Sequence, residues 1–586
     1  MLGGVNIPLA EYGRLLRRYL WPQRNTVMLM AALLLGSIGL QLIAPQAVRG
    51  FIDVVQAGAN EQALITSALV FIGASLGQQV LRVCAAYASE RVAWTATNAL
   101  RADLTAHVLR LDVGFHKTHP PGELIERVDG DVNALAGFFS DFAIQLIGSA
   151  VLLLGVLIAV ATIHVWLGLA MAIFVVGTLL ALGWVWQRGT PHWQNNRERS
   201  GQFYGFLGEA LTATEDLRAN GATPFVMQRF FAQLQGWLPV SLRAGFWGQS
   251  VMVAAIFAAA ISEALAYGIG GRLFFEGAIT LGEVYVVIAY AAMLGAPIEM
   301  IRAQVQALQR ASASIARVRD LLQTQSTVSD GVQPLPQTAL AVGVRGVHFR
   351  YEEADKNWAL RNVSFELAPG AVLGLLGHTG SGKTTLARLL FRQHDPQQGE
   401  VCLGGVAMRT AALASVRARV GWVTQDVQLF EASLRDNITF FNAEILDAKL
   451  MSVLHQLGLA DWLGRLPHGL NTVISAATLS AGEAQLIAFA RVFIKDPGLV
   501  ILDEASSRLD PATEALLDNA LEALLVGRTA IIIAHRLNTV ERADDILILE
   551  DGAVLEYGSR AALAGDTQSR FAQLKRINKL QKALTW

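Results

Sequence analysis

Cysteine is scarce in this sequence: its 586 residues include two, Cys84 and Cys402, which lie far apart. Their number and spacing exclude a disulfide framework and a zinc site, so we expect two unpaired packing residues. Charge is scarce as well, since charged residues make up 16% of the chain, against about a quarter in a typical soluble protein. The formal net charge is −1, so no overall field favours nucleic acid or an acidic ligand as a partner.

Long apolar stretches take the place of charge. Hydrophobic residues make up 53% of the sequence, and the mean hydropathy is +0.39. Six stretches are long and apolar enough to cross about 30 Å of hydrocarbon. They lie near Val27 to Pro45, Gln62 to Cys84, Phe138 to Ile163, Val165 to Trp186, Val251 to Phe274 and Leu281 to Met300. We therefore expect an all-α transmembrane domain of six helices.

The charges that flank the first stretch predict its orientation. Arg14, Arg17, Arg18 and Arg24 precede an apolar run without a small-residue cleavage pattern, so we expect no cleaved signal peptide. The loop after this run, residues 51–61, contains no Lys or Arg. The positive-inside rule therefore places the N-terminus in the cytoplasm, and six spans return the chain to that side. We predict a multi-pass protein of the plasma membrane, the inner membrane in a bacterium, surrounded by membrane lipids.

The connections between the spans are uneven. Spans two and three, and spans four and five, are joined by about fifty and sixty residues of polar, helix-like sequence. A run of about 25 helical residues extends about 37 Å, so we expect two long helical hairpins that reach into the cytoplasm. Residues 323–341 show little periodicity, which is typical of a linker. We predict a transmembrane domain over residues 1–322, this linker, and an α/β domain over residues 342–586.

A glycine-rich loop predicts the chemistry of the second domain. The segment GHTGSGKTT, from Gly377, fits G-x-x-x-x-G-K-[ST] and stands between the apolar strand AVLGLL and a helix. Loop N–H groups can cradle phosphates, Lys383 can reach the β- and γ-phosphates, and the Thr384 hydroxyl can ligate Mg²⁺. The nucleotide-binding residues predicted here are Gly377, Thr379, Gly380, Ser381, Gly382, Lys383, Thr384 and Thr385. The expected ligands are ATP and Mg²⁺.

Two further apolar strands end in residues that suit phosphate chemistry. The strand in LVILDEASSRLD ends in Asp503 and Glu504, and buried carboxylates are costly unless they bind a metal or move a proton. Asp503 suits the Mg²⁺ shell, and Glu504 suits the general base that polarises the attacking water. The strand in TAIIIAH brings His535 to the same sheet edge, where we expect it to contact the γ-phosphate.

These motifs, in this order after six spans, resemble the ATP-binding cassette (ABC) family, and the chain looks like a half-transporter of the exporter type. The segments GFHKTHPPGELIERVDGDV and GAITLGEVYVVIAYAAMLGAP in the first half carry the same resemblance. The resemblance implies that Tyr351 stacks on adenine, with Trp358 as the alternative. It also implies that Gln425 in VTQD links Mg²⁺ and water to the membrane domain. Asp510 in SSRLD would communicate across a dimer in which each ATP lies between two cassettes.

The signature departs from the family pattern, since it reads LSAGE from Leu479 to Glu483 where LSGGQ is usual. Ser480, Gly482 and the helix N-terminus would face a γ-phosphate bound by the partner. Ala481 adds a methyl where the backbone approaches the phosphate, and the charge of Glu483, at about 8 Å from it, costs about 2 kcal/mol. Family members also commonly carry a G-E-x-G element ahead of the signature, where this chain has NTVISAATLS.

These departures favour an asymmetric heterodimer with a second half-transporter. In this hypothesis Lys383, Asp503 and Glu504 form an active site with an intact partner signature, while LSAGE closes over a partner site that turns over slowly. A homodimeric exporter, in which LSAGE is harmless variation, and a membrane-anchored regulatory ATPase are the alternatives. Drugs, lipids and peptides stay open as cargo. Glu263, in the middle of the fifth span, either lines the translocation path or pairs with another helix.

Overall fold

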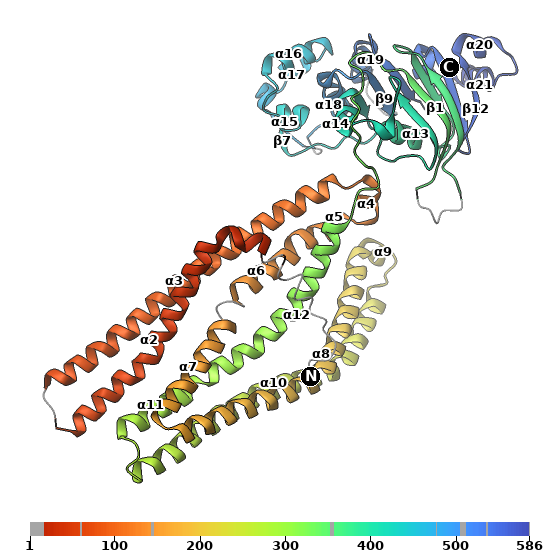
Figure 1. Ribbon diagram of the computed structural model, residues 1–586. Coiled ribbons are helices and arrows are strands. Elements are labelled where there is room, and N and C mark those ends of the chain that lie inside the picture. The colour runs from red at the N-terminus through yellow and green to blue at the C-terminus, as the bar shows by residue number, and fades with distance from the viewer. Residues whose placement is uncertain are drawn as a thin grey trace. The chain divides into compact units, whose positions relative to one another are not determined.

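A computed structural model of the chain (Figure 1) describes residue 14 and residues 17–58, 61–141, 146–351, 357–475, 478–503, 511–534 and 537–584. The chain folds into two compact units. The first comprises residues 1–109 and 121–324, and the second comprises residues 110–120 and 325–586. The first unit is helical and the second is built on β-sheets, so the predicted order of an all-α domain followed by an α/β domain is confirmed.

Four helices within the described residues are long and apolar enough to cross a membrane. They are α2 (Arg24–Gln56), α3 (Glu61–Arg110), α8 (Val165–Thr212) and α10 (Thr223–Phe275). They contain 33, 50, 48 and 53 residues, whereas one crossing needs about 20, so each continues beyond the hydrocarbon. The first, second, fourth and fifth predicted spans lie within these helices.

The third predicted span is described in part. Helix α7 (Gly148–Ile163) forms its second half, and residues 142–145 lie outside the described part of the chain. The shorter helical elements of this half of the chain are η1 (Trp21–Gln23), α4 (Val113–Thr118), α5 (Pro121–Ile125), the π-helical turn η2 (Glu126–Gly130), α6 (Asp131–Asp141) and α9 (Thr214–Ala219).

The sixth predicted span begins with α11 (Leu281–Met293) and continues into α12 (Gly295–Gln323). Leu294, the residue between the two elements, has φ and ψ of −73° and −24°, so the backbone stays helical. Pro297 explains why the two elements are separate, because it has no N–H to donate to the carbonyl of Met293. The final apolar stretch is therefore one helical run in which a backbone hydrogen bond is missing.

Helices α8 and α10 run side by side as a long hairpin closed by α9 (Figure 1). Two indole groups tie them together. Trp193 Nε1 donates to the carbonyl of Ala244 at 2.9 Å, and Trp237 Nε1 donates to Asn196 Oδ1 at 2.7 Å. A tryptophan suits such a place because its ring fills the space between the helices while its N–H is satisfied.

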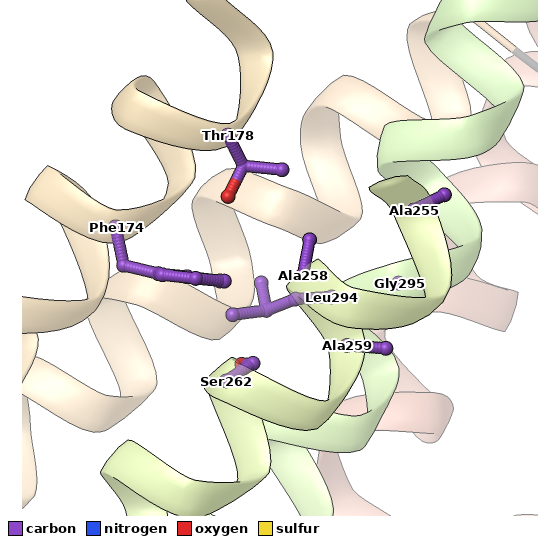
Figure 2. A pocket seen from close by; sticks show the side chains of 8 residues that line it. All are labelled: Phe174, Thr178, Ala255, Ala258, Ala259, Ser262, Leu294 and Gly295. Atoms are coloured by element: carbon purple, nitrogen blue, oxygen red, sulfur yellow. The ribbon is translucent and has the colours of Figure 1, made fainter. Parts of the chain in front are cut away.

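A small cavity lies beside Leu294 (Figure 2). Its volume of about 10 Å³ is at the lower limit for holding one water molecule. Phe174 and Thr178 of α8 line one side of it, as Figure 2 shows. The other lining residues, from α10 and the junction of α11 with α12, are Ala255, Ala258, Ala259, Ser262, Leu294 and Gly295. A transported molecule would not fit in this space.

The second unit contains two main β-sheets. The first is antiparallel, in the order β2 (Leu360–Leu367), β1 (Val342–Phe349), β4 (Gln398–Leu403) and β5 (Val406–Ala407). The second has the order β12 (Ala553–Ser559), β11 (Asp545–Glu550), β3 (Val372–Leu376), β10 (Thr529–Ile533), β9 (Leu499–Asp503) and β6 (Val420–Val423). In this sheet β12 pairs antiparallel with β11, and the other pairings are parallel. The short strands β7 (Ala432–Ser433) and β8 (Val473–Ile474) pair separately.

The central strands of the six-stranded sheet are buried along their whole length. All five residues of β3, β9 and β10 are buried, which explains why these strands read as apolar runs. The helical elements of this unit after β3 are α13 (Lys383–Leu390), η4 (Met408–Thr410), α14 (Leu413–Arg419), α15 (Leu434–Thr439), α16 (Asp447–Gln456), α17 (Ala460–Gly464), η5 (Gly469–Asn471), α18 (Ala481–Lys495), α19 (Pro511–Leu525), η6 (Leu537–Arg542), α20 (Arg560–Gly565) and α21 (Arg570–Leu584).

A buried ionic contact joins α6 to α12. The carboxylate of Asp131, which is 4% exposed, accepts hydrogen bonds from Arg317 Nε at 2.9 Å and from Ser314 Oγ at 2.9 Å. Removal of the carboxylate would leave the buried Ser314 hydroxyl without its acceptor, whereas water can solvate the Arg317 side chain, which is 50% exposed, so the cost is about 2 kcal/mol.

We therefore expect Asp131→Ala to lower the melting temperature of the purified protein by at least about 3 °C in a thermal-shift assay. Asp129→Ala is the matched control, because the Asp129 side chain is 61% exposed and its ion pair with Arg101 contributes less than about 1 kcal/mol. Equal shifts for the two variants would contradict a stabilising role for the buried contact.

Candidate nucleotide-binding site

The predicted phosphate loop lies between β3 and α13. Gly377, Gly380 and Gly382 have φ angles of +150°, +86° and +101°, which residues with side chains rarely adopt. A Cβ at Gly377 would also lie 2.3 Å from the carbonyl oxygen of Leu549. Helix α13 begins directly after the loop, at Lys383, so its positive N-terminal end adds to the loop N–H groups.

The polar side chains of the loop fit a bound phosphate. Lys383 is 5% exposed, and its Nζ donates to the carbonyls of Gly377 at 2.8 Å and His378 at 2.9 Å. The hydroxyl of Ser381 is buried and has no hydrogen-bond partner among the described residues. A buried hydroxyl of this kind is satisfied when a ligand oxygen arrives. Thr379 and Gly380 are exposed at the tip of the loop.

Two predicted metal ligands are brought together. The Thr384 hydroxyl donates to Asp503 Oδ2 at 3.4 Å, and Asp503 is 8% exposed at the end of β9. A hydroxyl and a carboxylate are hard oxygen donors, which suit Mg²⁺. Gln425 is exposed two residues after the end of β6, and it makes no hydrogen bond to a described residue, so the structure does not join it to this pair.

Three other predicted residues, Glu504, Asp510 and His535, lie outside the described part of the chain. The residues that precede two of them are placed: Asp503 ends β9, Ile533 ends β10, and these two residues are paired in the parallel ladder. The roles of Glu504, Asp510 and His535 stay predictions.

Tyr351, which is predicted to stack on adenine, is hydrogen-bonded to the helix that follows the phosphate loop. The Tyr351 hydroxyl lies 3.1 Å from Thr385 Oγ1, and Arg388 Nη1 donates to it at 2.8 Å. Arg388 lies one helical turn after Thr385 and is not part of the loop motif, so the motif alone did not point to it. Trp358, the alternative, packs instead against His348 and under the guanidinium of Arg350. Tyr351 therefore has the closer connection to the loop.

The signature forms the first turn of α18. Ser480 is the N-cap residue: its Oγ accepts from the N–H of Glu483 at 3.3 Å, and Glu483 Oε2 accepts from the Ser480 N–H at 2.9 Å. This reciprocal pair is a capping box, which stabilises a helix start. The Ser480 hydroxyl also lies 2.9 Å from Glu483 Oε2. Gly482 is buried, whereas Ala481 is exposed.

The carboxylate of Glu483 is stabilised in its charged form by hydrogen bonds within the chain. Partial burial by itself raises the pKa of Glu483, but hydrogen bonds from Trp462 Nε1, at 3.0 Å, and from Ser480 outweigh it, so the pKa is lowered. Trp462 stands 21 residues earlier, so the sequence pattern gave no sign of this contact. The negative charge expected from the sequence is therefore retained at neutral pH.

Comparisons with known proteins agree with this geometry. The family model described as ABC transporter matches residues 360–507, and the model described as ABC transporter transmembrane region matches residues 27–298. The chain is 30% identical to the ATP-dependent lipid A-core flippase of Chromobacterium violaceum, over 84% of this chain and 85% of that protein. The chain belongs to the ABC transporter family.

Two more relatives support this membership. A fatty acid ABC transporter ATP-binding/permease protein of Mycobacterium bovis is 30% identical over 79% of this transporter and 74% of that protein. The solved structure of a bacterial Atm1-family ABC exporter with ATP bound has the same fold, with a TM-score of 0.77 and 24% identity over 96% of this chain and 98% of that chain. The predicted resemblance to an exporter-type half-transporter is confirmed: this ABC transporter is a membrane protein that binds ATP and couples its hydrolysis to export.

The capping box predicts how Glu483 affects stability. Glu483→Ala removes the acceptor for the Ser480 N–H and for Trp462, so we expect a loss of about 1 to 2 kcal/mol and a lower melting temperature at pH 7. Glu483→Gln keeps an acceptor and should lose less.

The pH dependence has a defined sign. Because the pKa of Glu483 is lowered on folding, its charge contributes stability above the ordinary value of 4.5, and this contribution disappears as the pH falls through the lowered value. The difference between the native protein and Glu483→Gln should therefore shrink in thermal-shift measurements from pH 6 toward pH 4. A constant difference across this range would contradict the stabilising role of the carboxylate charge.

Proposed function

We propose that this transporter uses Mg²⁺ and ATP to export an amphipathic, lipid-like substrate across the bacterial inner membrane, as one subunit of an asymmetric heterodimer. The observation that carries the site assignment is the contact of Thr384 with Asp503 directly after the phosphate loop. It joins a hydroxyl from the first turn of α13 to a buried carboxylate at the end of β9, and Thr384 directly follows Lys383 of the phosphate loop.

The first part of the proposed mechanism is nucleotide binding. Lys383 and the loop N–H groups hold the phosphates, and Tyr351 stacks on the adenine. Thr384, Asp503 and Gln425 would hold Mg²⁺, which neutralises phosphate charge when it is bound. These side chains act by positioning and charge stabilisation, as phosphoryl transfer requires.

The second part is hydrolysis. Glu504 follows Asp503 directly, so its carboxylate takes the proton of the attacking water as the general base. His535 follows the end of the neighbouring strand β10 and donates a hydrogen bond to the γ-phosphate. Asp510 carries information about this site across the dimer interface.

Two features support the asymmetric heterodimer. Ala481 places an exposed methyl at the first position of α18, where the helix N-terminus would meet a partner's phosphate. The segment before the signature, NTVISAATLS, has neither the Gly nor the Glu usual for the family at that place. Both features weaken closure over the partner's nucleotide.

One observation favours the homodimeric alternative. The capping box of Ser480 with Glu483 is complete, and Trp462 also donates to the Glu483 carboxylate. A signature with a well-formed helix start is compatible with two equal sites. The composition of the purified complex decides between the two assemblies.

The proposal of a lipid-like substrate rests on relatives and on the membrane domain. Two relatives at 30% identity are named as a fatty acid ABC transporter and as a lipid A-core flippase. Glu263 is exposed on α10, within an apolar stretch, and makes no ion pair with a described residue. A lone carboxylate on such a surface suits contact with a polar or cationic headgroup, and we propose that it lines the translocation path.

Purification of the tagged chain from its native membrane, in mild detergent, tests the assembly. We expect a second, different ABC half-transporter in equimolar amount by mass spectrometry, with an intact LSGGQ signature. Recovery of this chain alone as an ATP-hydrolysing dimer would overturn the heterodimer and establish the homodimer.

Glu504→Gln tests the catalytic assignment. This variant keeps the shape and hydrogen bonding of the side chain but removes the base, so we expect ATP hydrolysis to fall at least about 100-fold while ATP binding survives. Glu444→Gln, an exposed residue ahead of α16, is the matched control and should hydrolyse ATP at the native rate. Near-native turnover by Glu504→Gln would show that another group is the base.

A further inference from the structure

The short helix α4 belongs to the cassette unit, although it lies between helices of the membrane unit in the sequence. Residues 110–120, which contain it, group with residues 325–586. The Asp112 carboxylate connects α4 to Thr327, which follows α12. Its Oδ1 accepts from the N–H of Phe115 at 3.0 Å as the N-cap of α4, and its Oδ2 accepts from the Thr327 N–H at 2.7 Å and hydroxyl at 2.9 Å.

The last turn of α4 contacts Tyr351, the residue proposed to stack on adenine. The ammonium of Lys117 lies over the ring of Tyr351, with Nζ 4.7 Å from the ring centroid. This distance is within the range of a cation–π contact. The ring of His394 meets Tyr351 edge-on at 5.6 Å, and a Cβ added at Gly114 of α4 would come within 3.8 Å of that imidazole.

The orientation of Tyr351 is thus set from several sides. Thr385 and Arg388 hold its hydroxyl, His394 and Phe349 meet the ring edge-on, and Lys117 lies over the ring. The side chain is still 39% exposed, so ring surface is left for a base. Lys117 is the contact that comes from residues 110–120, the part of this unit that lies between the membrane helices in the sequence.

We propose that Lys117 is a positioning residue for the adenine base, and that it couples base binding to the attachment of α4. This inference rests on the proposed role of Tyr351 in stacking on adenine. The ammonium holds the ring in the orientation that the base needs, so the base binds more tightly when Lys117 is in place. Coupling between two binding events is reciprocal, so a bound base also strengthens the contact of α4 with Tyr351.

A ligand without a base distinguishes this role from a general structural one. Inorganic tripolyphosphate carries the phosphate chain but has no adenine, so it occupies the phosphate loop without touching Tyr351. Loss of Lys117 should therefore weaken the binding of ATP and leave the binding of tripolyphosphate unaffected. Damage to the cassette fold would weaken the binding of both ligands.

The experiment uses the intact transporter in lipid nanodiscs, with its natural partner chain if it has one. For Lys117→Met we expect the KM for ATP to rise about two- to fivefold, with kcat unchanged, since the contact is exposed and of modest strength. The inhibition constant of tripolyphosphate should stay at its native value. Lys117→Arg, which keeps a cation, should restore the KM, and Lys449→Met on α16 is the matched control for loss of an exposed lysine.

Tyr351→Ala separates failure of this inference from failure of the proposed site. If Tyr351→Ala raises the KM and Lys117→Met then adds nothing to it, the two residues act together as proposed. If Tyr351→Ala raises the KM but Lys117→Met alone does not, the role of Lys117 is wrong and the adenine site stands. If Tyr351→Ala leaves the KM unchanged, both assignments fail. If Lys117→Met weakened the binding of ATP and of tripolyphosphate equally, the inference would also be overturned.

Discussion

The parallel pairing of β10 with β3 on one side and β9 on the other is the constraint on which the chemistry of the cassette depends. Strands that run the same way end at the same edge of a sheet, and ligands bind at that edge. The contact of Thr384 with Asp503 joins residues 119 positions apart in the sequence only because of this alignment. A slip of β9 by one residue would turn Asp503 to the other face of the sheet.

In the helical unit, polar contacts decide which helices lie next to one another, as strand pairing does in the sheet. Apolar side chains gain little by leaving lipid, so hydrogen bonds and close packing decide how such helices associate. Arg49 of α2 pairs with Glu283 of α11 at 2.8 Å, and Tyr290 of α11 donates to the carbonyl of Leu42 at 2.7 Å. With Asp131 between α6 and α12, these contacts specify the neighbours of the final two helical segments.

The sequence predicted most of the fold because its signals are local. Apolar length located the four long spans, and the glycine spacing located the phosphate loop, in which Gly382 has a positive φ. Contacts between distant segments could not be predicted. Sequence reasoning weighed the charge of Glu483 against the helix N-terminus alone, because it could not see Trp462 beside it. It also missed the contact of Lys117 with Tyr351.

The hydrogen bond that Pro297 cannot donate gives the last apolar stretch a weak point that a complete ladder lacks. A helix resists bending because each turn is hydrogen-bonded to the next. Here α11 is anchored to α2 and α12 is anchored to α6, and Leu294, the residue between them, keeps helical dihedral angles. The last apolar stretch therefore bends most easily at this turn, where one backbone hydrogen bond is missing.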